Sequence, residues 1–144
     1  MAYCTQQDLV DRIGEDLLKE LTDREGEGEV NETRLAQAIA AASAEVDSYV
    51  HKLYPAPLDP VPARIQAVTG DIAIYRLMVA IGYDAASADG TWALLYRGII
   101  DWLKQVAKGE GADIGQDNPA PQGDQPSVLV APARIFGRDT MQGF

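Results

Sequence analysis

The sequence contains one cysteine and one histidine among its 144 residues. A single cysteine excludes an internal disulfide and any zinc site built from several cysteines, as expected for a chain made in a reducing cytoplasm. The sequence also lacks an uninterrupted apolar run of about 18 residues, and residues 1–11 contain no basic or strongly apolar stretch. We therefore expect neither a signal peptide nor a membrane span.

Basic residues are scarce as well. Twelve Lys and Arg stand against 22 Asp and Glu, which gives a formal net charge of −10 and a pI near 4.4. Proteins that bind nucleic acid or an anionic membrane through charge need clustered Lys and Arg side chains. The composition therefore argues against both classes.

Aromatic residues make up only 7% of the chain, whereas alanine alone accounts for 21 positions. Alanine is the best helix former, and a chain of this length can bury about 68% of its unfolded surface in a single core. We predict an all-α fold, a small helical bundle of about four main helices that covers residues 1–109. An extended C-terminal linker and a docking tail are expected to follow it.

Start and stop signals divide this helical domain into segments. Thr5, with Asp8 three positions later, is typical of a helix N-cap, and Gly14 ends that short helix. Apolar residues at helical spacing predict further helices at 15–21, 31–53, 62–82 and 91–108. The first of these is a short helix or a turn. The apolar set of the helix at 62–82 widens toward its C-terminal end, which favours this helix as the centre of the bundle.

Four acidic residues lie at alternate positions in a segment that also contains two glycines, namely Asp23, Glu25, Glu27 and Glu29. Like charges repel, so we expect residues 23–30 to form a mobile, solvated loop that lies on the surface or lines a lumen. A Ca²⁺ site is disfavoured, because the segment lacks the Asp and Asn pattern and the twelfth-position Glu of a calcium-binding loop.

The composition changes after Gly109. Residues 110–126 carry mostly Gly, Pro and polar side chains that have little to bury, which predicts a flexible linker. Residues 127–144 are apolar again, with a strand-like run from Val128 to Val130. We expect this last segment to contact a partner through its large apolar side chains, Ile135, Phe136, Met141 and Phe144.

Candidate catalytic residues are few. Cys4 and His51 lie in different predicted segments without a third member, so we expect Cys4 to pack as a small hydrophobe and His51 to lie near a helix C-terminus. Trp92, Tyr96 and Trp102 lack the positive groove of a base-stacking platform, so we expect them to pack in the helical core. We predict no enzyme activity, no cofactor and no metal site.

Several short motifs, taken in order, resemble a known family. They are Tyr3 to Leu9, Arg12-Ile13-Gly14, Leu21-Thr22-Asp23, Ala38-Ile39, Ala42, Glu45 to Tyr49, Tyr54-Pro55, Pro62, Asp71-Ile72-Ala73, Tyr75 and Arg134 to Phe144. Their order and spacing resemble those of the Mu-like phage and prophage proteins long known only as a domain of unknown function. This chain departs from that pattern at Gly137, where a small hydroxyl residue is more usual, and at residues 51–53, where a basic Arg is more usual.

The resemblance implies a role among the head-tail connector, or adaptor, proteins of tailed phages. By this resemblance the chain is a subunit of a ring, expected to be twelve-fold, that docks beneath the portal protein at the head-tail junction of the virion. It presents a surface to the next neck or tail component, DNA passes through the channel without specific binding, and no enzyme activity is implied. The residues expected to dock on the portal are Arg134, Ile135, Phe136, Arg138, Asp139, Met141 and Phe144.

The excess of acid leaves a second hypothesis open, in which the chain mimics DNA and inhibits a host nucleic-acid enzyme. A mimic needs carboxylates spaced along one face like phosphates, whereas the formal charge here is −7 for residues 1–33, 0 for residues 34–109 and −3 for residues 110–144. In the connector hypothesis the same charge would instead repel DNA from the channel wall.

Overall fold

The computed structural model describes residues 1–83, 90–110 and 113–115. Its regular elements are five helices: α1 (Gln6–Ile13), α2 (Glu15–Thr22), α3 (Glu32–Val50), α4 (Ala63–Ala80) and α5 (Thr91–Lys108). The described part of the chain contains no strand, which confirms the predicted all-α class. Two of the long helices, α3 and α4, end two or three residues earlier than their apolar spacing suggested.

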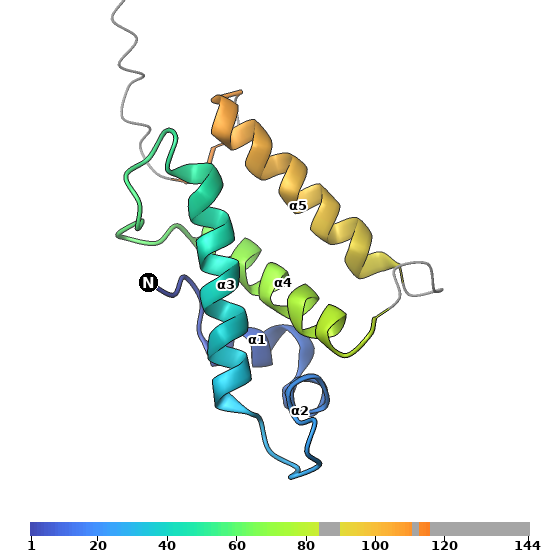
Figure 1. Ribbon diagram of the computed structural model, residues 1–144. Helices are drawn as coiled ribbons and strands as arrows, with labels where there is room; N and C mark the ends of the chain where they lie inside the picture. The colour runs from blue at the N-terminus through green and yellow to red at the C-terminus, as the bar shows by residue number, and fades with distance from the viewer. Residues whose placement is uncertain (84–89, 111–112, 116–144) are drawn as a thin grey trace, which may run out of the picture.

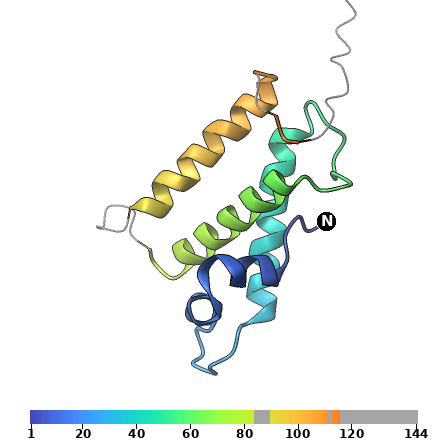
Figure 2. The same ribbon diagram turned by 180° about the vertical axis from the view of Figure 1, so that it is seen from behind.

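The helices surround α4, as Figures 1 and 2 show from opposite sides. Helices α3 and α5 pack against α4 and against each other, and α1 and α2 cover a different part of α4. Ile72, Ala73 and Ile74 are consecutive, and each is completely buried. Three successive residues point in three directions around a helix, so α4 is enclosed on several sides. The prediction of a central helix at this position is confirmed.

The helix ends follow the signals in the sequence. The Thr5 hydroxyl accepts a hydrogen bond from the Asp8 N–H, and the Asp8 carboxylate accepts one from the Thr5 N–H, which completes a capping box at α1. Gly14 has a φ of +82°, which a residue with a side chain rarely adopts, so it separates α1 from α2. The Asn31 side chain caps α3, and Gly109 in the left-handed conformation follows α5.

Tyr3 fastens the N-terminus to the bundle. Its N–H donates to the Ser43 hydroxyl (3.1 Å), its hydroxyl donates to the Asp47 carboxylate, and the same hydroxyl accepts from the Leu58 N–H (2.9 Å). Burial of the ring and the Asp47 carboxylate raise the pKa of Tyr3 to about 12. One side chain thus joins the N-terminus, α3 and the segment that leads into α4.

Two polar contacts hold α1 on α4. The Gln66 amide donates to the Asp8 carboxylate (2.9 Å), and this hydrogen bond is the main cause that lowers the pKa of Asp8. Arg12 forms an ion pair with Asp71. The Arg12 side chain also lies over Gly70, where an added Cβ would come within 3.4 Å of the guanidinium Nε.

Aromatic side chains connect α4 to α5. Tyr75 and Tyr96 stack with ring centroids 4.3 Å apart, and the Tyr96 hydroxyl donates to Glu45 on α3 (2.6 Å). Glu45 also pairs with Arg76 at 2.7 Å. Burial and the bond to Glu45 raise the pKa of Tyr96 to about 12. The contact links α3, α4 and α5 at one level of the bundle.

Trp92, Tyr96 and Trp102 are all partly buried and pack against the core, which agrees with the predicted packing role. Trp102 also lies under the Arg64 guanidinium, 4.4 Å from the ring centroid. The three side chains lie in different surroundings along α5, since Trp92 lines a surface groove and Tyr96 stacks on Tyr75.

Packing extends past Gly109. Ile114 is completely buried in the core cluster, and Gly115 lies beside Pro62. The sequence places these residues in the polar linker, where a lone Ile gives no sign of burial. The expected division into a linker at 110–126 and a docking segment at 127–144 stays a prediction, because residues 116–144 lie outside the described part. Among the described helices, none is long and apolar enough to cross a bilayer.

Candidate interaction site

The acidic loop after α2 is organised by Asp23. Its carboxylate accepts hydrogen bonds from the backbone N–H groups of Gly26 (2.8 Å), Glu27 (3.0 Å) and Gly28 (2.7 Å). Gly26 and Gly28 have φ values of +79° and +76°, conformations that favour glycine. These backbone bonds, with the one to Gly28 contributing most, lower the pKa of Asp23. The two glycines thus form a small anion-binding loop, and the anion is the chain's own Asp23.

Glu25 fastens the same loop to α3. Both of its carboxylate oxygens accept from the Arg34 guanidinium, at 2.6 and 2.5 Å, and Arg34 also donates to the Thr22 carbonyl oxygen (2.9 Å). This hydrogen bond to Arg34 is the main cause that lowers the pKa of Glu25. The prediction that the four acids of this loop only repel one another is therefore wrong for two of them, because Asp23 and Glu25 have hydrogen-bond partners. Glu25, Glu27 and Glu29 are nevertheless exposed, as a surface acidic loop requires.

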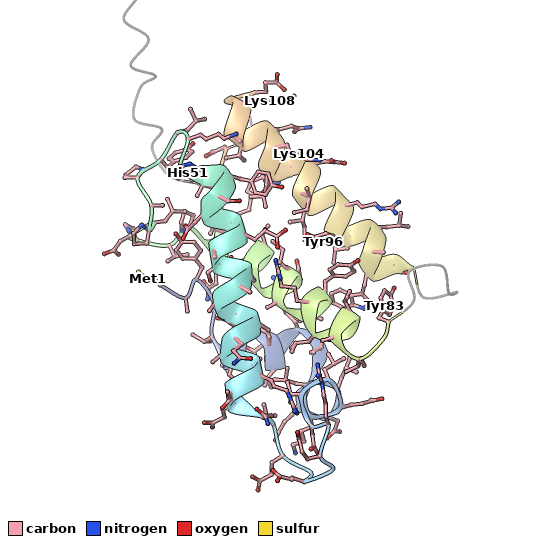
Figure 3. All side chains as sticks on the ribbon, viewed as in Figure 1. Met1, His51, Tyr83, Tyr96, Lys104 and Lys108 are labelled. Carbon is pink, nitrogen blue, oxygen red and sulfur yellow. The ribbon has the colours of Figure 1, made fainter. Side chains whose placement is uncertain are left out.

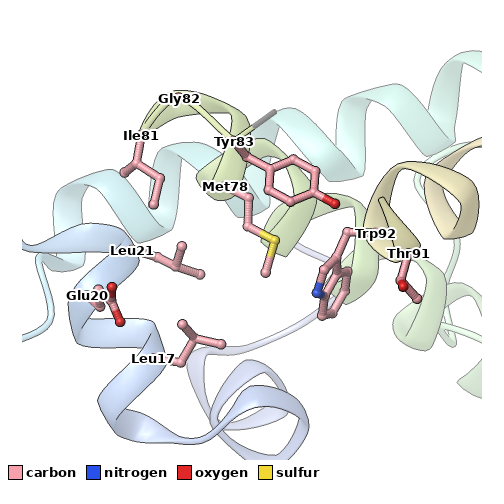
Figure 4. Close-up of a pocket in the computed structure, with 9 residues that line it drawn as sticks. All are labelled: Leu17, Glu20, Leu21, Met78, Ile81, Gly82, Tyr83, Thr91 and Trp92. Carbon is pink, nitrogen blue, oxygen red and sulfur yellow. The ribbon is translucent and has the colours of Figure 1, made fainter. Parts of the chain in front are cut away.

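A surface groove lies where α2, the C-terminal end of α4 and the start of α5 meet (Figure 4). Its volume is about 510 Å³. Most of the lining residues have aliphatic or aromatic side chains, and the full set is Leu17, Glu20, Leu21, Met78, Ile81, Gly82, Tyr83, Thr91 and Trp92. Figure 4 shows side chains of α2 facing those of Met78 and Trp92 across the opening. A groove with this lining suits an apolar segment of a protein more than a charged ligand.

Exposed apolar side chains continue beside the groove. Val79 and Ile81 are each 48% exposed, and on α5 Leu94 is 68% and Leu95 42% exposed. Three of them, Val79, Ile81 and Leu95, belong to the apolar residues whose spacing predicts the helices at 62–82 and 91–108, and that spacing does not separate these exposed positions from the buried ones.

The outer surfaces on the two sides of α4 differ in charge. Helices α1 and α2 expose Asp11, Glu15, Asp16 and Glu20. The outer face of α5 exposes Arg97, Lys104 and Lys108 with one acid, Asp101, and Figure 3 labels Lys104 and Lys108 along this helix. One side of the domain is therefore acidic and the other mildly basic.

Cys4 and His51, the two candidate catalytic residues, both lie where they serve the fold. Cys4 is buried, and this burial raises the pKa of its thiol to about 11, which disfavours the thiolate that a nucleophile needs. His51 is the C-cap of α3, and its Nδ1 donates to the Asp47 carbonyl oxygen (2.9 Å), which confirms its predicted place at a helix end. Residues 1–83, 90–110 and 113–115 contain no group of three or more His, Cys, Asp or Glu side chains placed to hold a metal ion.

The predicted docking residues are not placed by the structure. Arg134, Ile135, Phe136, Arg138, Asp139, Met141 and Phe144 all lie outside the described residues. Sequence reasoning missed the groove, since its lining comes from three helices whose relative placement no local pattern reveals. The helix predicted at 62–82 has more apolar residues around Val79 and Ile81 than one buried face needs. This excess was the signal in the sequence that could have indicated an exposed apolar site.

Comparison with known proteins adds family membership. Residues 3–130 match the family described as "Bacteriophage Mu, Gp36". The chain is also 25% identical over 143 residues to the "Mu-like prophage FluMu protein gp36" of Haemophilus influenzae, an alignment that covers 99% of this chain and 97% of that protein. Because the match spans most of the chain, this protein belongs to the Bacteriophage Mu Gp36 family of Mu-like phage proteins.

Proposed function

We propose that this chain is a structural virion protein, the head-tail connector (adaptor) subunit of a Mu-like phage. In this proposal the subunits form a dodecameric ring beneath the portal, link it to the next neck or tail component and leave a channel for DNA. The observation that carries the proposal is the family match over residues 3–130, which supports a phage structural or morphogenesis protein. The subunit acts without catalysis or a cofactor at the head-tail junction, after synthesis in the host cytoplasm.

The placement of the two charged sides supports a ring. A closed ring uses two different patches on each subunit, so that one patch meets the other patch of the neighbour. The acidic surface of α1 and α2 and the mildly basic outer face of α5 lie on different sides of α4. Charges of opposite sign on separate faces favour such a head-to-tail contact and disfavour a contact between identical faces.

The net charge supports a conduit for DNA. Twelve copies at −10 each would carry a formal charge of −120. A wall of that sign repels phosphates, so DNA would pass without adsorbing. The second hypothesis, a DNA mimic, fits the geometry less well, since Asp23 is engaged by backbone amides and Glu25 by Arg34.

Removal of residues 127–144 tests the docking role directly. The truncation leaves every described residue in place, so helix content by circular dichroism should be unchanged while the protein is lost from portal-containing heads. Phe136→Asp should also weaken docking strongly, and Gln142→Ala should serve as the matched control with near-normal docking. Retention of the truncated chain on heads at wild-type copy number would refute docking through the tail.

A further inference from the structure

The groove at the C-terminal end of α4 is large enough and apolar enough to hold a peptide segment. Its volume of about 510 Å³ lies within the range of roughly 300–1,000 Å³ typical of ligand pockets. Leu21 and Met78 form buried walls, while Ile81 is 48% exposed at the opening. An exposed apolar side chain at the opening of such a groove favours a site where an apolar segment binds.

The charge beside the groove restricts the occupant. Glu20 lines the groove, and Asp16, one helical turn before it on α2, is also exposed. An occupant should therefore combine apolar side chains with basic ones. The chain itself has such a segment at residues 134–144, where Ile135, Phe136, Met141 and Phe144 are interspersed with Arg134 and Arg138.

The last described residue lies at the opposite end of α4 from the groove. Gly115 lies beside Pro62, the N-cap of α4, with 3.8 Å between the Pro62 Cβ and the position of a Cβ on Gly115. Helix α4 has 18 residues and is therefore about 27 Å long, and its C-terminal end forms one wall of the groove. The tail must span roughly that distance to reach the groove of its own chain.

The length of the linker matches this span. Nineteen residues lie between Gly115 and Ile135. A random-coil chain of this length has a root-mean-square end-to-end distance of about 25 Å and a fully extended reach of about 70 Å. When linker length matches the span, the effective concentration of a tethered segment reaches the millimolar range. Binding to the groove of the same chain is thereby favoured over binding to a second copy at micromolar concentration.

We propose that residues 134–144 bind in the groove between α2, α4 and α5 of the same chain in the free subunit. Ile135 and Phe136 fill the apolar groove, and Arg134 and Arg138 face Glu20 and Asp16. The same tail cannot bind the groove and the portal at once, so docking on the portal uncovers the groove for another component. The groove contact goes beyond the proposed function and does not depend on it.

Paramagnetic broadening in the full-length free protein tests this contact. A nitroxide attached at Gln142→Cys will label selectively, because the single natural cysteine, Cys4, is buried. The methyl signals of Leu21, Met78 and Ile81 should lose most of their intensity relative to the reduced label. Undiminished signals would overturn the proposal.

Three variants and a mixing experiment sharpen the result. Phe136→Asp in the tail and Ile81→Glu at the exposed rim should each restore the remaining methyl intensities, whereas Leu94→Glu, which changes a more exposed leucine outside the groove lining, should leave the broadening unchanged. Restoration by Leu94→Glu to the same degree would contradict a specific groove contact. If methyl-labelled chains without a nitroxide are broadened equally by spin-labelled copies, the tail binds in trans and the same-chain proposal is wrong. Portal docking is measured in a separate experiment. Absence of the groove contact alone would contradict only the groove proposal, and absence of portal docking alone would contradict only the connector proposal.

Discussion

Helices α3, α4 and α5 share an apolar core and one polar cluster at Glu45, whereas the lobe formed by α1 and α2 is acidic and is oriented on α4 by polar contacts of α1. Residues 1–33, which contain the lobe, have a formal charge of −7, and residues 34–109, which contain all of α3 to α5 except the first two residues of α3, have a charge of zero. Leu9 and Leu18 anchor the lobe in the core, and Asp8 and Arg12 fix its orientation on α4. Burial thus stabilises the bundle, and a few named side chains determine where the acidic surface lies.

The largest expected effect comes from truncation in the centre of α4. Ile72→Ala removes completely buried methyl groups and should lower the free energy of unfolding by about 2–5 kcal/mol in urea titrations. Leu9→Ala should instead accelerate hydrogen exchange mainly in α1 and α2. Uniform acceleration across all helices in both variants would show that the lobe and the bundle unfold as one unit. That result would contradict the distinction drawn between them.

Loss of the Tyr3 hydroxyl should have the next largest effect. Tyr3→Phe leaves the Leu58 N–H and the Asp47 carboxylate without their shared partner, which should cost about 1–3 kcal/mol in thermal or chemical unfolding. Asp47→Asn retains an acceptor for the hydroxyl and should cost less. The explanation is wrong if Asp47→Asn is the more damaging change.

Alkaline pH should weaken the same contact. The folded-state pKa of Tyr3 is raised to about 12 from an ordinary value of 10.0, so the stabilisation is complete below pH 10 and is lost as the pH rises toward 12. Tyr96 contributes over the same range, because its pKa is also raised to about 12. Unfolding titrations between pH 8 and 12 should show a smaller alkaline loss for Tyr3→Phe than for the wild-type chain, and equal losses would contradict this assignment.

The ion pair between Arg12 and Asp71 should contribute less. Its two side chains are 31% and 18% exposed, and partly exposed pairs are typically worth about 0.2–1 kcal/mol. A double-mutant cycle with Arg12→Ala and Asp71→Ala should give a coupling in this range that decreases with added salt. A coupling of zero would assign the orientation of α1 to Asp8 and Gln66 instead.

The smallest effect on global stability is expected at Asp23, whose hydrogen bonds lie within a surface loop. Asp23→Ala should accelerate hydrogen exchange at Gly26 and Gly28 with little change in the unfolding transition. The pKa of Asp23 is lowered, so in the wild-type chain this protection is present above the ordinary Asp pKa and lost as the pH falls through the folded value. Glu29→Ala is the matched control, and equal acceleration in that variant would contradict the role of Asp23.

Local signals in the sequence predicted the helices well, because caps and apolar spacing act over three or four residues. Thr5 with Asp8, Asn31 and Gly109 mark helix ends that the structure confirms. Membership of a Mu-like phage family was also accessible, since the motifs that carry the resemblance lie along most of the chain that the family match covers.

Contacts between distant residues could not be predicted. Arg12 and Asp71 lie 59 positions apart, and Tyr3 and Asp47 lie 44 apart, so no local spacing relates them. Apolar spacing also cannot distinguish a residue covered by a neighbouring helix from an exposed one such as Ile81, which lines the groove. The order of the acidic loop was missed because net charge indicates repulsion and does not reveal a carboxylate bound by backbone amides at Asp23.

The position of the protein in the particle tests the central claim most directly. Particles of the phage or prophage that encodes the chain should be purified and their necks reconstructed by cryo-electron microscopy. The connector proposal predicts a ring of twelve copies of the helical domain directly beneath the portal, with a continuous central channel. Absence of the protein from purified particles, or its location elsewhere in the virion, would contradict it.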